Sequence, residues 1–155
     1  MKKALCIVIT AIILLSLSGC SDLFGAVFLS AVVAQGDDRA KKQDIFSFVI
    51  AHEEELLQSI EENDVSHFEN SGIVISVSVN TSAVDFYCGG VGITPSSTYV
   101  GFFCSPQDDM TAFYPSVSEG LIPFGDGFLW KEEGGDNRFY TEKICNCFYY
   151  YEESY

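Results

Sequence analysis

The strongest constraint on the fold is a change in the spacing of apolar residues near Gly72. Before this glycine, apolar side chains recur at helical spacing with acidic side chains opposite them; the apolar positions are Ile45, Val49, Leu56 and Ile60. After it, apolar and polar residues alternate, and the apolar set is Ile73, Ile75, Val77 and Val79. The sequence therefore predicts one long amphipathic helix, from Asp44 to about Asn63, followed by a strand with one buried face.

Four further strands are predicted along the rest of the chain, near residues 84–88, 100–104, 128–131 and 148–152. Gly, Pro, Asn and Asp cluster between them and indicate turns, and residues 110–127 are expected to form an irregular loop with one short strand at most. Strands that follow a single helix favour an α+β domain. We expect residues 44–155 to form one such domain, with one long amphipathic helix packed on an antiparallel sheet of four to five strands.

The N-terminus has the layout of an export signal. Lys2 and Lys3 precede an apolar run over residues 4–15, and small residues follow it. The run is shorter than the ~20 apolar residues that a membrane-spanning helix needs. The tetrad Leu-Ser-Gly-Cys at 17–20 resembles the lipobox of bacterial lipoproteins. That resemblance implies a signal peptide over residues 1–19 and a diacylated Cys20, and two acyl chains hold a protein stably on a membrane.

Residues 20–43 are expected to form a lipidated N-terminus that includes a second apolar stretch over residues 23–34. This stretch is too short to cross a bilayer. Two interpretations stay open for it: an interfacial helix beside the lipid anchor, or a helix that packs on the domain. In either case the membrane is a partner through the anchor, and the domain is expected on the extracytoplasmic side of the cell membrane.

Charge and composition exclude two classes of protein. The chain has 22 acidic and 8 basic residues, for a formal charge of −14, and loss of Lys2 and Lys3 with the signal takes this to −16. Such a surface repels nucleic acid, which is usually bound by clustered Lys and Arg. The second excluded class is intrinsically disordered protein. The composition is 48% hydrophobic and 19% charged, so the chain can bury enough apolar surface to fold.

Several segments of the C-terminal half resemble a group of small bacterial lipoproteins of unknown function. The segments are VDFYCGG at 84–90, SSTYVGF at 96–102, DDMTA at 108–112, and GDNRFYTEKIC at 135–145 with the aromatic run that follows it. The resemblance implies a lipoprotein ectodomain and brings no activity with it.

Four cysteines lie in the expected domain: Cys88, Cys104, Cys145 and Cys147. Cys88 and Cys104 share the parity of apolar residues on neighbouring predicted strands and lie symmetrically about Ser96, so we expect their side chains to be neighbours and to bridge in an oxidising compartment. A register slip of one or two residues makes Cys145 or Cys147 the partner instead. Buried free thiols remain an alternative, and a zinc site is disfavoured because only one close pair of cysteines exists.

The sequence contains no arrangement typical of catalysis. It has two histidines, His52 and His67, and no Gly-x-Ser-x-Gly elbow. Cys88 lies on the apolar side of its strand, where a thiol is usually unreactive. We therefore expect no enzyme activity, no cofactor and no metal. The alternative is a small envelope hydrolase or thiol redox protein that uses Cys88 or the Cys145 and Cys147 pair.

Aromatic residues are the feature that points to binding, because 17 of the 22 lie between Phe86 and Tyr155. The run over 148–151 puts aromatic side chains on both faces of one strand, and one face is expected to be exposed. The candidate binding surface is Tyr149, Tyr151 and Trp130, and plain packing is the alternative. We thus expect a noncatalytic binding or accessory domain whose partner is an envelope protein or a glycan. A carbohydrate binder that uses these aromatics is a further alternative.

Overall fold

The computed structural model describes residues 39–93 and 96–155. The predicted signal peptide over 1–19, the expected lipidation site Cys20 and the apolar stretch over 23–34 lie outside these residues. Within the described part of the chain, no helix is both long enough and apolar enough to cross a membrane.

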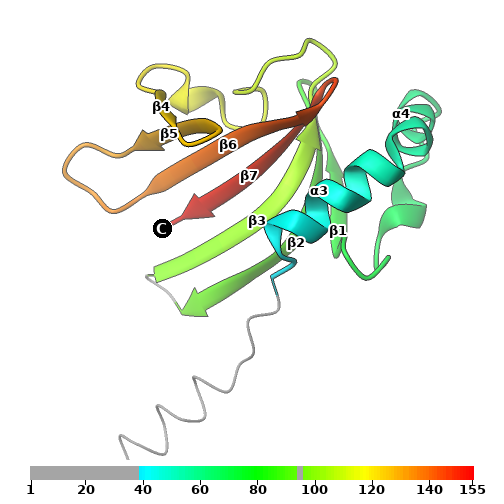
Figure 1. Cartoon of the computed structure of the whole chain (residues 1–155), viewed down its shortest axis with the longest axis horizontal. Coiled ribbons are helices and arrows are strands. Elements are labelled where there is room, and N and C mark those ends of the chain that lie inside the picture. Colours follow the sequence, from blue (N-terminus) through cyan, green and yellow to red (C-terminus); the bar gives the residue numbers. More distant parts are fainter. Residues whose placement is uncertain (1–38, 94–95) are drawn as a thin grey trace, which may run out of the picture. The chain divides into compact units, whose positions relative to one another are not determined.

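One antiparallel sheet of seven strands dominates the fold (Figure 1). In chain order the strands are β1 (Ser76–Val79), β2 (Val84–Ile93), β3 (Ser96–Cys104), β4 (Ile122–Phe124), β5 (Gly127–Lys131), β6 (Arg138–Cys145) and β7 (Phe148–Ser154). Across the sheet the order is β1-β2-β3-β7-β6-β5-β4. The C-terminal strand β7 is therefore central, and the two edges are formed by the two shortest strands, which limits the unpaired backbone exposed there.

Two short helices, α3 (Lys42–Ala51) and α4 (Glu53–Glu61), replace the one long helix that we expected. The helical backbone is interrupted at His52, which has φ −115° and ψ 17°. The apolar stripe is interrupted at the same point, because polar His52 and Glu53 separate the buried residues of α3 from those of α4. Glu53 instead accepts a hydrogen bond from the Asn146 side chain, at the turn between β6 and β7.

The prediction of one long helix on four to five strands is therefore wrong in both parts. The strand that it missed is β6, which carries Arg138 and Glu142 on one face and Lys143 on the other. Charge on both faces hides the alternation by which a half-buried strand is found. β4 holds only three residues, with Pro123 at its centre, and lies in the region expected to be mainly loop. A proline is tolerated there because β4 is an edge strand.

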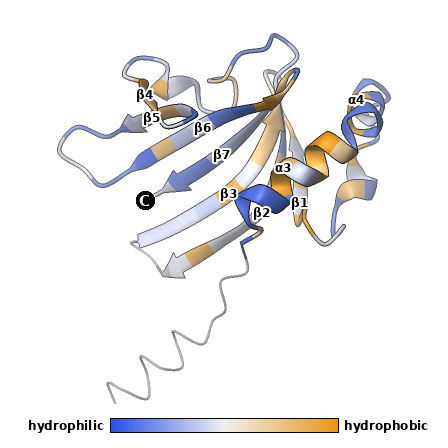
Figure 2. Ribbon diagram, in the orientation of Figure 1, coloured by the Kyte–Doolittle hydropathy of each residue, from blue (hydrophilic) through white to orange (hydrophobic). Residues whose placement is uncertain are grey.

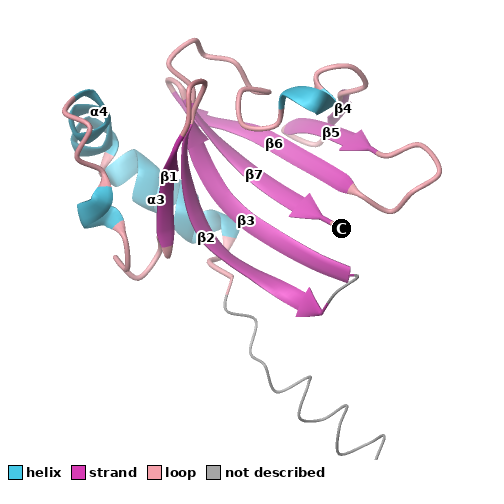
Figure 3. Ribbon diagram, turned by 180° about the vertical axis from the view of Figure 1, so that it is seen from behind, coloured by secondary structure: helices cyan, strands magenta, loops and turns pink. Residues whose placement is uncertain are grey.

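Helix α3 covers part of one face of the sheet, as the front view and the view from behind both show (Figures 1 and 3). Ile45 and Val49 of α3 and Leu56 of α4 are fully buried in a core cluster with Phe86, Phe102 and Phe148 of the sheet. Apolar colouring is concentrated where α3 crosses the strands, whereas the end of β7 is polar (Figure 2). This face thus has an apolar half under the helices and a polar half beyond them.

The opposite face of the sheet is covered by the connection over residues 105–121, which contains the short 3-10 helix η2 (Pro115–Val117). Ala112 and Val117 of this connection are buried in a second core cluster with Phe103, Tyr149 and Tyr151. A segment without regular strands therefore closes this face.

The face of strand β1 that was predicted to be buried is only partly covered. Ile75 and Val79 are 46% and 57% exposed, whereas Val74 is 1% exposed. The strand begins only at Ser76, after a bend, and it forms the edge of the sheet. The fully buried apolar residue therefore precedes the strand, but the predicted face is correct within the strand, because Val77 lies opposite Phe86 and packs against the same core cluster.

Candidate functional site

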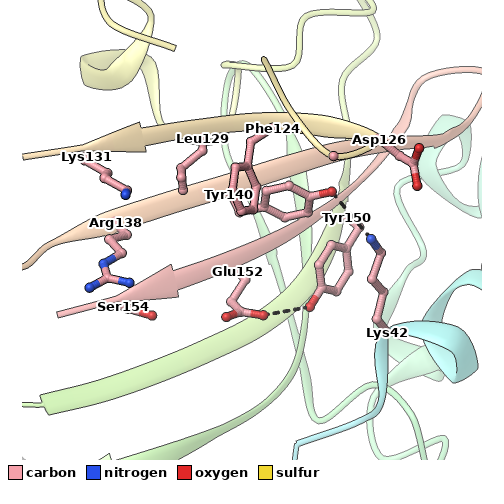
Figure 4. Close-up of a pocket in the computed structure, with 11 residues that line it drawn as sticks. Lys42, Phe124, Asp126, Leu129, Lys131, Arg138, Tyr140, Tyr150, Glu152 and Ser154 are labelled. Carbon is pink, nitrogen blue, oxygen red and sulfur yellow. Dashed lines mark hydrogen bonds between the residues drawn. The ribbon is translucent and has the colours of Figure 1, made fainter. Parts of the chain in front are cut away.

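A pocket of about 500 Å³ lies over strands β5–β7, on the half of the sheet that α3 leaves open (Figure 4). Ligand sites in proteins typically have volumes of about 300–1,000 Å³. The pocket is bordered by Lys42 of α3, by Phe124 at the end of β4 and by Asp126 in the β4–β5 turn. Its wall combines aromatic rings with charged groups of both signs.

Strand pairing aligns the side chains that line the floor of this pocket. Residues directly opposite each other on antiparallel strands point to the same face of the sheet. Two such rows cross β5, β6 and β7: Leu129–Tyr140–Glu152 and Lys131–Arg138–Ser154. The composition of the floor is therefore set by the register of three strands.

The end of the pocket nearest α3 is closed by Lys42. Its ammonium group lies 5.4, 5.2 and 5.5 Å from the ring centroids of Phe46, Tyr140 and Tyr150. It also forms an ion pair with Glu142, which is 9% exposed and accepts a hydrogen bond from the Tyr140 hydroxyl. Cation–π contacts and the ion pair together hold the start of α3 on the sheet.

The two tyrosines of the pocket are neutral hydrogen-bond donors. Burial, followed by the hydrogen bond to Glu142, raises the pKa of Tyr140 well above its usual value. Burial and the charge of Glu152 do the same for the pKa of Tyr150, whose hydroxyl lies 3.3 Å from the Glu152 carboxylate. The aromatic wall therefore stays uncharged over the physiological pH range.

The far end of the pocket carries two cations, Lys131 and Arg138, directly opposite each other on β5 and β6 (Figure 4). Among the described residues, neither forms an ion pair, whereas Lys42 and Lys143 are paired with Glu142 and Asp108. Like charges directly opposite each other destabilise a sheet. In a chain with a formal charge of −14, two neighbouring cations that form no ion pair with a described residue are the most distinctive electrostatic feature of the pocket.

Our sequence reasoning missed this pair, although the sequence holds a signal for it. Lys131 and Arg138 lie at equal distances from Gly134 and Gly135, in a segment already expected to be a turn. Residues placed symmetrically about a hairpin turn pair across it. Because β6 was not predicted, Arg138 had no strand on which to be placed.

The predicted aromatic surface lies in the core rather than on an exposed face. Tyr149 and Tyr151 are 3% and 2% exposed, on the face of the sheet opposite the pocket. The Tyr149 hydroxyl donates to Asp108 in the covering connection, at 2.6 Å from the Oδ1 atom. Trp130 is half-buried and packs against the same cluster. A connection that sequence analysis treated as irregular loop therefore seals the surface that we expected to bind a partner.

Cys88 and Cys104 do not lie opposite each other as predicted. Cys104 is opposite Val84, and Cys88 lies at a β-bulge without a partner across the hairpin. The hairpin also turns earlier than expected, because Ser96 is opposite Ile93 rather than at the centre of the turn. All four described cysteines are free thiols, and the Sγ of Cys104 lies 3.1 Å from the Sγ of Cys147.

The thiols give no support to a cysteine nucleophile or a metal centre. Burial raises the pKa of Cys88 far above its ordinary value, and burial with the neighbouring Glu53 raises the pKa of Cys145 to about 11. Both are therefore protonated at neutral pH, in the unreactive form of a thiol. Within the described part of the chain, no group of three or more His, Cys, Asp or Glu side chains is arranged to hold a metal ion.

Comparison of the chain with protein-family models, curated proteins and solved structures finds no match. Functional inference therefore depends on the chain's own residues. The pocket offers a cationic end, an uncharged aromatic wall and two carboxylates, from Asp126 and Glu152. Such a site can hold an anion, pack against a ring and accept hydrogen bonds from hydroxyl groups.

Proposed function

We propose that this protein is a lipoprotein tethered to the extracytoplasmic side of the cell membrane, and that its domain is a noncatalytic binding module for an acidic sugar or short acidic glycan. The lipobox-like tetrad that ends at Cys20 supports the tether. The observation that carries the ligand class is the pair of cations at the pocket, Lys131 and Arg138, which form no ion pair with any described residue.

The cationic pair favours an anionic group at its end of the pocket. Two like charges held directly opposite each other destabilise a sheet. A bound anion removes this repulsion, because it attracts both side chains at once. The planar guanidinium of Arg138 can donate two parallel hydrogen bonds to a carboxylate or a phosphate.

The remaining lining favours a sugar ring over a free inorganic anion. Phe124 is 57% exposed, and its ring centroid lies 6.3 Å from that of Tyr140. A sugar ring packs its C–H bonds on such aromatic surfaces, while its hydroxyl groups donate to acceptors around them. Glu152 and Asp126 supply carboxylate acceptors in the same pocket.

Calorimetric titration tests the ligand class. The purified protein is titrated with a glucuronic acid oligosaccharide and with a neutral glucose oligosaccharide of equal length. We expect only the acidic one to bind, and we expect Lys131→Gln and Arg138→Gln each to weaken binding by about 10-fold or more, because each removes a charge-assisted contact. Lys41→Gln, which removes an exposed cation outside this pocket, is the matched control and leaves the affinity unchanged. Equal binding of both oligosaccharides, or no effect of either pocket variant, contradicts the proposal.

The tether is tested separately by metabolic labelling with a fatty-acid analogue in a bacterial host. Cys20→Ala removes the thiol that the acyl chains need, so labelling and lipoprotein-type cleavage should both be lost. Cys6→Ala, within the expected signal peptide, is the control and retains both. Labelling that persists in Cys20→Ala refutes the lipoprotein assignment and leaves the pocket proposal intact.

A further inference from the structure

We infer that Cys104 and Cys147 form a disulfide bond when the protein is in an oxidising compartment. Their Sγ atoms lie 3.1 Å apart. A disulfide has an S–S distance of about 2.05 Å, so the two sulfur atoms need to approach by only about 1 Å. The inference is independent of the ligand that the pocket binds.

Backbone pairing holds the two cysteines close together. Cys104 is the last residue of β3 and lies opposite Phe148, the first residue of β7. The next backbone N–H, of Ser105, donates to the carbonyl oxygen of Cys147 at 2.9 Å. Cys147 itself is in the two-residue turn of the β6–β7 hairpin, which the pairing of Cys145 with Phe148 closes. Bond formation therefore needs little movement of the main chain.

The other two described thiols have different surroundings. Cys88 lies on β2 at the bulge, and its thiol donates to the carbonyl oxygen of Phe86 at 3.4 Å. The thiol of Cys145 lies near the Glu53 carboxylate of α4, and burial together with this carboxylate raises its pKa. Among the described cysteines, only Cys104 and Cys147 have thiols within contact distance of each other. The bridge is therefore expected to be specific for this pair.

The oxidant that we propose is a small disulfide such as oxidised glutathione, which reacts by thiol–disulfide exchange. The half-buried Cys147 is the accessible thiol, so its thiolate attacks one sulfur of the oxidant, forming a mixed disulfide and releasing one glutathione. Burial raises the pKa of Cys104, which is 2% exposed, so this thiol loses its proton as it attacks the Cys147 sulfur held beside it and releases the second glutathione. Two protein thiols are oxidised to one disulfide, the oxidant is reduced to two thiols, and the two protons pass to the released glutathione molecules.

The pairing is tested by peptide mapping of the full chain. The folded protein is equilibrated with oxidised glutathione, free thiols are alkylated in denaturant without reduction, and the chain is cleaved with chymotrypsin. Tyr99 and Phe103 provide cleavage sites that separate Cys88 from Cys104. We expect a cross-linked peptide pair containing Cys104 and Cys147, with alkylated Cys88 and Cys145. Alkylation of both Cys104 and Cys147, or a bridge from either of them to Cys88 or Cys145, overturns the inference.

Serine variants provide the matched controls. Cys147→Ser should abolish the cross-link and Cys88→Ser should retain it. Cys145→Ser should also retain it, and it removes the ambiguity between the two cysteines that share a peptide. The bridge closes a loop between residues 43 apart in sequence. In the chain-entropy description, such a closure raises Tm by roughly 10 °C. This rise on oxidation should be present in the wild type and Cys88→Ser and absent in Cys147→Ser; a rise that persists in Cys147→Ser also overturns the inference.

Discussion

On one face of β7, Tyr150 and Glu152 border a pocket, whereas on the other face Tyr149 and Tyr151 are sealed beneath the 105–121 connection. The residue types on the two faces are alike, and alternation along the strand places them with equal regularity. Their roles differ because α3 covers only half of its face, while the connection covers the aromatic residues on the other. The comparison shows that coverage, rather than residue type, decides on which face of the strand the pocket over β5–β7 forms.

The two faces also differ in how the charge of a buried carboxyl group is balanced. On the α3 face, Lys42 neutralises the carboxylate of Glu142. On the sealed face, Asp85 is 9% exposed and forms no ion pair with any described residue, and burial raises its pKa to about 7 against the opposing effect of hydrogen bonds from Tyr151 and Ser78. The buried carboxylate on the α3 face is therefore balanced by a cation, whereas proton uptake balances the buried carboxyl group on the sealed face.

The largest expected effects come from two adjacent residues of β3 that serve opposite faces. Phe102 and Phe103 are both fully buried, Phe102 with α3 and Phe103 with the 105–121 connection. Phe102→Ala and Phe103→Ala should each lower the free energy of unfolding by about 3–5 kcal/mol, because each leaves a large cavity. Hydrogen exchange should accelerate in α3 for the first and in residues 105–121 for the second. Faster exchange in the same segment for both variants breaks the comparison.

Because the carboxyl group of Asp85 is buried, we expect the free energy of unfolding of the protein to fall as pH rises. Its pKa is about 7 in the folded protein against an ordinary 3.8, so the folded state binds the proton more tightly than the unfolded state. The associated stability is complete below about pH 4 and is lost as pH rises through 7, an effect of about 2–4 kcal/mol. Asp85→Asn, measured by urea unfolding from pH 4 to pH 8, should remove this loss. Asp136→Asn, in an exposed turn, is the control; equal pH slopes in the two variants contradict the assignment.

The Lys42 contacts predict a smaller effect on the α3 face. Lys42→Met keeps an apolar stem against the rings but leaves the Glu142 carboxylate without its cation. Because the Lys42 side chain is 44% exposed, solvent offsets much of the loss, and we expect about 1–2 kcal/mol. Urea unfolding measures the change. Lys41→Met, one residue earlier and exposed, should lie within about 0.5 kcal/mol of the wild type; an equal cost for both variants excludes a specific role for Lys42.

The smallest effect on stability is expected at the pocket rim. Phe124 is 57% exposed, so Phe124→Ala should change the free energy of unfolding by no more than about 0.5 kcal/mol. The same variant should weaken binding of the glucuronic acid oligosaccharide several-fold, because it removes a stacking surface. A loss of stability comparable to that of Phe103→Ala places Phe124 in the core and removes it from the binding site.

Several parts of the fold follow from local patterns in the sequence. The burial of Leu56 and the shared apolar side of Val100, Phe102 and Cys104 were predicted correctly. The long helix was not, because the polar residues His52 and Glu53 break the stripe and a tertiary contact to Asn146 accommodates the break. Helical periodicity indicates which residues are apolar neighbours, but it does not show where a helix is interrupted.

Those local sequence patterns could not predict the pocket. The floor of the pocket forms only when β6 pairs with both β5 and β7. This pairing brings Lys131, Arg138 and Ser154 into one row. The cysteine contact is of the same kind, since Cys104 and Cys147 are 43 residues apart and meet only when β3 pairs with β7. Long-range register creates both features, whereas alternation within one strand constrains only the side on which each residue lies.

The sequence by itself determined that this chain is acidic and rich in strands, with an apolar helical segment near residue 45 and aromatic residues on both faces of its last strand. Those properties follow from composition and from periods of 3.6 and 2, which act over a few neighbouring residues. Tertiary structure alone decided that Tyr149 and Tyr151 lie beneath the 105–121 connection and that Tyr150, which is equally buried, lies at the floor of a pocket. The physical reason is that burial depends on which distant segment covers a face, and here a connection with little regular structure covers one face while a short helix leaves half of the other open.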